Sequence, residues 1–212
     1  MKEKEEDISL ASFWDERYTK SSGEIPTHEW FKTFESLKPF FQEHLLDKRP
    51  AETNPCVLQL GCGDSTVPAD LWNLGYRNQI CIDFSTVVIQ KMSERHADKA
   101  GIKWMYGDVR DMPAIPDASV DVAVDKGTLD AMVSGSPWDP PEHVKENIRR
   151  YVDEVTRILK PGGTFLYITF RQPHFMKPHL LRDGVWDVQV EELDDDKGSF
   201  GYFGFVIEKK PA

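Results

Sequence analysis

Two glycines and one acid stand at the ends of apolar runs, where a small ligand could be held. Gly61 and Gly63 follow the run 57–60, and Asp83 follows the run 80–82. Glycine tolerates positive φ and lets a ligand approach the backbone closely, while a carboxylate at the end of the next strand can accept hydrogen bonds from both hydroxyls of a ribose. A plain tight turn or an ordinary strand-end carboxylate would look the same in isolation. Together the three residues predict a site for a nucleoside that carries a ribose.

The glycine turn departs from the fingerprint of dinucleotide-binding domains. That fingerprint has a third glycine, which lets helix and strand pack closely around a pyrophosphate. Thr66 stands at this position. The departure counts against a nicotinamide cofactor and favours a ligand whose single carboxylate faces the helix N-terminus near 64–67.

Strands and helices alternate along most of the chain. We expect strands over 56–60, 79–83, 102–106, 120–124 and 164–169, and helices over 66–74, 86–99, 142–160 and 174–181. An earlier helix is expected over 29–46, kinked or broken at Pro39. Two closing strands, over 185–193 and 200–208, are joined by the acidic loop 194–198. Because no helix separates them, at least one of the two runs antiparallel.

This alternation predicts an α/β fold. The expected architecture is a Rossmann-like, doubly wound sheet of about seven strands, mostly parallel with an antiparallel C-terminal hairpin, and with helices on both faces. The 212 residues suit one domain, 1–212, in which segment 1–50 precedes a core over 51–212. Ligands of such sheets bind at the carboxyl ends of the strands, where the strand order reverses.

Residues at the ends of the third and fourth expected strands extend the site. Asp108 lies in register with Asp83, where its carboxylate can accept a hydrogen bond from an adenine amino group and the N–H of Val109 can serve a ring nitrogen. Phe84 can lie against the adenine face. Lys126 comes just past the fourth strand, near the reacting end of the ligand, although a solvated lysine would look the same in the sequence.

These segments resemble those of class I S-adenosylmethionine-dependent methyltransferases, on the turn 60–63, the acid at 83, the pair 107–108 and the segment 159–163. The resemblance covers about residues 56–208. A narrower resemblance, to the methyltransferases related to elongation factor 1-alpha lysine methyltransferase 4, covers nearly the whole chain. It rests on segments 13–18, 29–31, 60–65, 125–131 and 173–175. Two positions differ from that family: Asp125 stands where Glu is expected, and Met176 stands where a basic residue is expected.

The resemblance implies S-adenosyl-L-methionine as the cofactor, with segment 1–50 covering it. The implied cofactor-binding residues are Trp14, Tyr18, Trp30, Gly61, Gly63, Asp83, Phe84, Asp108, Val109 and Lys126. Trp14, Tyr18 and Trp30 would fold over the methionine end, because aromatic faces attract a cation such as a sulfonium by roughly 0.5–2 kcal/mol. On the residues alone, these rings could equally pin an N-terminal helix to the core.

The resemblance further implies a protein-lysine N-methyltransferase that acts on a translation elongation factor or a similar protein, with elongation factor 1-alpha as the candidate. A small-molecule methyltransferase, a non-catalytic cofactor-binding partner protein and a nicotinamide oxidoreductase remain alternatives. A lysine nucleophile must lose a proton from a group whose free pKa is about 10.4. Asp125 and Asp130 are candidates to accept it, although solvent can also serve as the base.

Charge and composition exclude several other classes. The formal net charge of −10 counts against nonspecific binding to nucleic acid or an anionic membrane. No apolar run approaches the roughly 20 residues of a membrane span, and segment 1–7 lacks the apolar stretch of a signal peptide. The cysteines Cys56, Cys62 and Cys81 suit a reducing compartment, and no Cys/His cluster has the spacing of a metal site. We therefore expect a cytoplasmic monomer without a metal.

Overall fold

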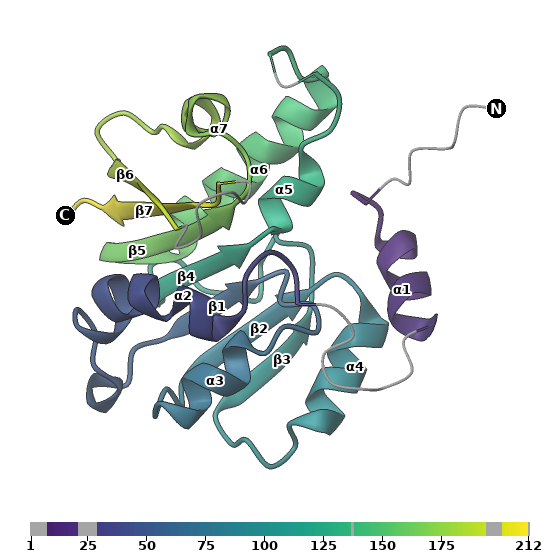
Figure 1. Ribbon diagram of the computed structural model, residues 1–212, viewed down its shortest axis with the longest axis vertical. Coiled ribbons are helices and arrows are strands. Elements are labelled where there is room, and N and C mark those ends of the chain that lie inside the picture. The colour runs from purple at the N-terminus through teal and green to yellow at the C-terminus, as the bar shows by residue number, and fades with distance from the viewer. Residues whose placement is uncertain (1–7, 21–28, 137, 194–200, 212) are drawn as a thin grey trace.

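The computed structural model describes residues 8–20, 29–136, 138–193 and 201–211. Within them, one seven-stranded sheet has the order β3-β2-β1-β4-β5-β7-β6 (Figure 1). The strands are β1 Val57–Leu60, β2 Gln79–Asp83, β3 Ile102–Tyr106, β4 Val120–Lys126, β5 Leu159–Thr169, β6 Trp186–Glu192 and β7 Phe203–Lys209. Strands β1 to β5 pair in parallel, whereas β7 pairs antiparallel with both β5 and β6. The predicted fold class is confirmed.

Helices cover both faces of the sheet. They are α1 Ala11–Lys20, α2 Phe34–Phe41, α3 Val67–Asn73, α4 Thr86–Arg95, α5 Thr128–Met132, α6 Glu142–Ile158 and α7 Pro173–Leu180. On one face, α5, α6 and α7 pack on the sheet, with Tyr151 and Phe165 fully buried among them. On the other face, Leu37 of α2 and Leu71 of α3 pack against Val122. Helix α1 lies beside α4, away from the main body of the sheet (Figure 1).

The strand order reverses between β1 and β4, which are neighbours in the sheet although β2 and β3 separate them in the chain. Strands that are buried on both faces read as continuous apolar runs, which is why the local pattern located them. All four residues of β1 are buried. Side chains that follow the ends of β1, β2, β3 and β4 therefore gather at one edge of the sheet.

The expected helix over 29–46 is wrong in its start and in its break. The chain at Phe31 has φ 65°, so it is not helical, and α2 begins only after Thr33, whose hydroxyl accepts the N–H of Ser36. Pro39 lies inside α2 without ending it. The chain then continues as a π-helix over Gln42–Leu46. Pro39 is the sixth of the eight residues of α2, where it removes a single hydrogen bond without ending the helix, and a kink there stays a prediction.

Most other boundaries differ from the sequence-based expectation by one to a few residues, and those of α4, β4 and β5 are among them. Helix α4 ends at Arg95 rather than 99. Strand β4 runs on to Lys126, so this residue is the last of the strand and not just past it. Strand β5 begins at Leu159 rather than 164, because Leu159 already pairs with Val120 ahead of a register shift. The acidic loop 194–198 lies outside the described residues. Among the helices that are described, none has the length and hydrophobicity of a membrane span.

Candidate active site

A cavity opens at the carboxyl ends of β1 to β4. It contains about 1250 Å³ of empty space, part of it open to solvent. Its lining includes nine of the ten residues predicted to bind the cofactor: Trp14, Tyr18, Trp30, Gly61, Gly63, Phe84, Asp108, Val109 and Lys126. Residues separated by more than 100 positions in the chain thus meet where the strand order reverses, as doubly wound folds require.

The turn after β1 depends on its two glycines. Gly61 has φ 59° and Gly63 has φ 50°, a region that other residues rarely adopt. A Cβ on Gly61 would lie 2.2 Å from Oγ1 of Thr128, and a Cβ on Gly63 would lie 2.8 Å from the hydroxyl of Tyr18. Thr128 donates that hydroxyl to the carbonyl of Leu60 at 2.8 Å, which ties the turn to the start of α5. Backbone angles and packing against Thr128 and Tyr18 therefore both require glycine at these two positions. Close approach of a ligand to this backbone stays a prediction.

The N-terminus of α3 faces a carboxylate of the protein itself. Glu29 accepts the Ser65 hydroxyl at 2.7 Å and the Thr66 N–H at 2.9 Å. Nζ of Lys126 lies 2.5 Å from Oε1 of Glu29 and also donates to the carbonyl of Trp30 at 2.6 Å. Glu29 thus takes one backbone N–H of this N-terminus, that of Thr66. That the N-terminus also holds a carboxylate of the ligand stays a prediction.

Burial acts on both partners of this ion pair. It raises the pKa of Glu29, but Lys126 and the hydrogen bonds from Thr66 and Ser65 outweigh it and hold that pKa below its ordinary value. Burial also lowers the pKa of Lys126, and the nearby Glu29 offsets this only in part. The pair therefore fixes segment 29–31 to the turn after β1. The sequence pattern drew attention to the aromatic residues of that segment and missed Glu29.

Asp83 stabilises the turn after β1 by accepting hydrogen bonds. One carboxylate oxygen accepts the Gly63 N–H and the other accepts the Ser85 N–H, each at 2.9 Å. Burial raises the pKa of Asp83 to about 6 against these two bonds. Its side chain is not part of the cavity lining, whereas the next residue, Phe84, is. Contact between Asp83 and a ribose stays a prediction.

Asp108 is held in the cavity wall by an arginine that the sequence pattern did not single out. The Arg110 guanidinium donates from Nε to Oδ1 at 2.9 Å and from Nη2 to Oδ2 at 2.7 Å. Burial raises the pKa of Asp108, but the hydrogen bonds from Arg110 outweigh it and hold that pKa below its ordinary value. The cavity therefore contains an ionised acceptor at the end of β3.

The two candidate bases occupy different places. Asp125 is fully buried behind the cavity, where it accepts the N–H groups of Thr128 and Leu129 and the hydroxyl of Tyr151. These bonds start α5, and burial raises the pKa of Asp125 to about 7. Asp130 lines the cavity, and burial raises its pKa to about 6. The structure thus brings only Asp130 to the site.

Hydrogen bonds fix the orientation of Asp130. Its carboxylate accepts the hydroxyls of Tyr167 at 2.7 Å and Thr169 at 2.6 Å. Nε of Arg171 lies 3.6 Å away. Helix α5, which follows Gly127 with φ 95°, turns Asp130 towards the cavity while Asp125 stays in the strand.

Aromatic rings close the cavity on the side of the N-terminal segment. The ring of Trp14 lies 5.6 Å from that of Trp30 and 5.8 Å from that of Tyr18. Phe31 continues this wall to Phe170, which follows β5, at 5.4 Å. Burial keeps the pKa of Tyr18 above its ordinary value, so its hydroxyl stays protonated. The rings do pack α1 against the body of the protein, and they also form one wall of the cavity.

Comparison with known proteins identifies the family. Residues 58–167 match a family model described as a methyltransferase domain. EEF1A lysine methyltransferase 4 of Mus musculus is 34% identical over 202 residues, which cover 94% of this chain and 75% of that protein. The chain belongs to the class I S-adenosylmethionine-dependent methyltransferases.

Other relatives share parts of their length with this methyltransferase. The eEF1A lysine and N-terminal methyltransferase of Homo sapiens is 32% identical over 209 residues, covering 97% of this chain but 27% of that protein. Among solved structures, the N-methyltransferase NodS from Bradyrhizobium japonicum, in complex with S-adenosyl-L-homocysteine, is similar with a TM-score of 0.64. At 13% identity, over 96% of this chain and 99% of that one, this likeness shows the shared fold.

The cavity of the methyltransferase fits the cofactor of its family. The glycine turn after β1 lines the cavity without bulky side chains, aromatic rings form one wall, and Asp108 is an ionised acceptor. Gln59 of β1 also lines the cavity, and its buried Nε2 has no hydrogen-bond partner among the described residues. An unpaired buried donor is costly unless a ligand satisfies it. S-adenosyl-L-methionine as the cofactor, predicted from the resemblance, is confirmed by the family.

Proposed function

We propose that this methyltransferase is a protein-lysine N-methyltransferase that acts on elongation factor 1-alpha. One observation carries the proposal: similarity to a relative with that name extends over 94% of the chain. The similarity therefore cannot be confined to the methyltransferase domain at 58–167 and must include flanking segments. Those flanking segments supply Trp14, Trp30 and Phe170 to the cavity.

The residues that would hold the cofactor divide into two groups. Asp108, Val109 and Phe84 would hold the adenosine, as their places after β3 and β2 suggest. The glycine turn, Trp14 and Trp30 would hold the methionine end. Asp83 would accept hydrogen bonds from the ribose hydroxyls. It also stabilises the turn, because it accepts the Gly63 N–H.

S-adenosylmethionine, when bound, would supply a methyl group to the acceptor nitrogen by in-line displacement, with S-adenosylhomocysteine as the leaving group. The protein's contribution is to align the amine and to exclude water. The rings of Trp30, Phe31 and Phe170 would desolvate an entering lysine and so favour its neutral amine over the ammonium. Asp130, ionised above pH about 6, would attract the ammonium as it enters, and solvent would take its proton. In this proposal the enzyme acts in the cytoplasm, as a monomer, on a protein and not on nucleic acid.

The proposal is tested with S-adenosylmethionine that carries a tritiated methyl group, added with the enzyme to a cell lysate. We expect label in a protein of the size of elongation factor 1-alpha, on a lysine. Label confined to small molecules would contradict the proposal and favour a small-molecule methyltransferase. Binding of S-adenosylhomocysteine without any transfer would favour the non-catalytic partner protein.

A further inference from the structure

A second hollow lies beside the cavity, between the loop that follows α5 and helix α7. Its lining includes Val133, Pro140, Phe170, Arg171, Phe175 and Met176. Phe170 and Arg171 border both the hollow and the cavity. Phe170, the residue after β5, is 47% exposed and stands between the two spaces. A chain segment that lies in the hollow would therefore pass directly by the cavity mouth.

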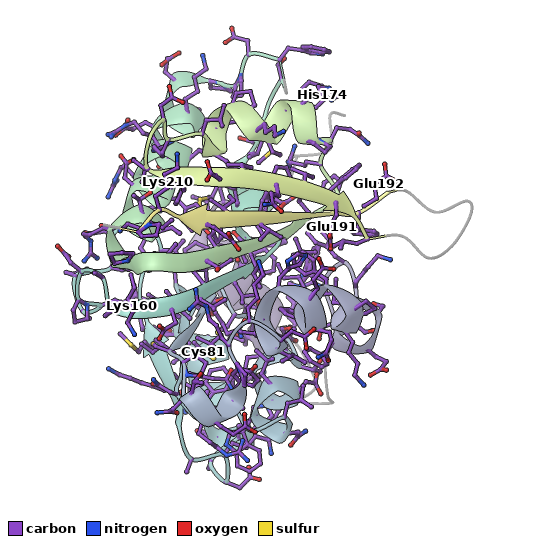
Figure 2. The ribbon with its side chains drawn as sticks, turned by 90° about the vertical axis from the view of Figure 1, so that its left-hand side faces the viewer. Cys81, Lys160, His174, Glu191, Glu192 and Lys210 are labelled. Carbon is purple, nitrogen blue, oxygen red and sulfur yellow. The ribbon has the colours of Figure 1, made fainter. Side chains whose placement is uncertain are left out.

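An exposed tryptophan stands at the outer side of this hollow. Trp138 is 80% exposed, and its ring lies edge-to-face on Phe175 at 4.8 Å. Tryptophan is enriched at interfaces, because its large rigid ring buries much area at little cost in entropy. Figure 2 shows His174, at the start of α7, at the same end of the sheet as Glu191 and Glu192 of β6. The N-terminal end of α7 therefore lies at the end of the sheet where β5 ends.

The hollow lies on the side of the cavity that is not assigned to the cofactor. The turn after β1 and the ends of β2 and β3 are assigned to the cofactor, so the ends of β4 and β5 remain for the methyl acceptor. Arg171 also lies on this side, where its Nη2 donates to the carbonyls of Asp130 and Val133, and the Asp130 carboxylate near its Nε offsets part of its charge. Lys177 of α7 lies outside the lining of the hollow.

Charge around Trp138 favours a basic side chain. Asp139 and Glu142 are both exposed and share one cation, with Nζ of Lys145 at 2.8 Å and 2.9 Å. One net negative charge remains in this trio, next to an exposed aromatic face. A lysine or arginine of a partner could bind there by charge and by a cation–π contact at once.

We propose that Trp138, Phe170, Phe175 and the hollow between them, here called the acceptor shelf, bind the segment of the protein substrate that carries the methyl-accepting lysine. This segment has an apolar side chain that enters the hollow beside Met176, and a second basic residue that faces Trp138, Asp139 and Glu142. The inference rests on the proposed function, since it requires a protein as the acceptor. It adds the part of the enzyme that selects the substrate.

The test compares Trp138→Ala with the wild type, using intact elongation factor 1-alpha as the substrate and S-adenosylhomocysteine as the cofactor probe. Tryptophan is enriched among the interface residues that contribute most to binding, so we expect KM for the protein to rise about tenfold, which corresponds to 1.4 kcal/mol. Calorimetric affinity for S-adenosylhomocysteine stays unchanged. For Trp138→Phe, which keeps an aromatic ring, KM should stay close to that of the wild type. The double variant Asp139→Asn, Glu142→Gln should raise KM more at low salt than at high salt.

The control is Leu74→Ala, which truncates an exposed apolar residue just after α3, at the opposite end of the strands. Its KM should match that of the wild type. If the wild type methylates no protein, the proposed function and the acceptor shelf are both refuted. If the wild type methylates its protein and Trp138→Ala has the same KM, the acceptor shelf alone is refuted. A change in sedimentation with unchanged KM would instead make this face a contact between two copies of the chain, which also overturns the inference.

Discussion

The buried ion pair between Glu29 and Lys126 gives the sharpest test of how the N-terminal segment is attached. The two side chains are 10% and 8% exposed, and the charged atoms are 2.5 Å apart. Removing one partner of a buried pair costs about 3–5 kcal/mol, because the other charge remains without compensation. In Glu29→Gln the amide oxygen can still accept from Ser65 or Thr66, and Lys126 can lose its proton because burial already lowers its pKa. We therefore expect about 3 kcal/mol, the lower end of that range.

The measurement is thermal unfolding followed by circular dichroism at neutral pH. A loss of about 3 kcal/mol predicts a Tm lower by about 6–12 °C in a chain of this size. Affinity for S-adenosylhomocysteine should fall as well, since Trp30 is adjacent to Glu29 in the chain and its carbonyl accepts from Lys126. The double variant Glu29→Gln, Lys126→Met serves as the control, because it removes both charges and should recover part of the loss. A Tm of Glu29→Gln equal to that of the wild type would refute the reasoning.

Two further predictions follow from the site. Gly61→Ala should abolish measurable binding of S-adenosylhomocysteine by calorimetry, because its Cβ would meet Thr128 at 2.2 Å, whereas Gly162→Ala, with φ 74° but nothing within 4 Å, should bind like the wild type. If Gly61→Ala binds S-adenosylhomocysteine as tightly as the wild type does, the turn after β1 does not bind the cofactor. Asp125 has a pKa of about 7 in the folded protein against about 3.9 when unfolded, so the folded state binds its proton more readily between these values. The stability that this group contributes is present below pH about 4 and lost as pH rises to about 7. The difference in unfolding free energy between the wild type and Asp125→Asn, measured by urea denaturation, should therefore fall over that range, and a constant difference would contradict the raised pKa.

Much of the fold could be predicted from the sequence because its signals are local. Buried parallel strands read as apolar runs, and β2 has the predicted bounds. The edge strand β3 also has the predicted bounds, although its side chains are only partly buried or exposed. A helix is expected from residue 86, and the hydroxyl of Ser85 just before it accepts the N–H of Val88. Gly61 and Gly63 could be recognised because a turn with positive φ favours glycine.

The features that could not be predicted depend on contacts between distant segments. Glu29 meets the N-terminus of α3 from 37 residues away, and no local pattern marks such a partner. Whether Asp125 or Asp130 faces the cavity depends on a five-residue helix, α5, too short to have a periodic pattern. Arg110 could have been suspected as a partner of Asp108 two positions earlier, but its effect on that carboxylate required the geometry.

The central claim, that a lysine of elongation factor 1-alpha is methylated in this cavity, is tested most directly with purified components. The enzyme, S-adenosylmethionine and elongation factor 1-alpha from the same organism are incubated together, and the modified residue is mapped by mass spectrometry of peptides. We expect one or more methyl groups on a lysine side chain. A methyl group on the N-terminal amine alone, or an unmodified elongation factor beside a methylated small molecule, would contradict it.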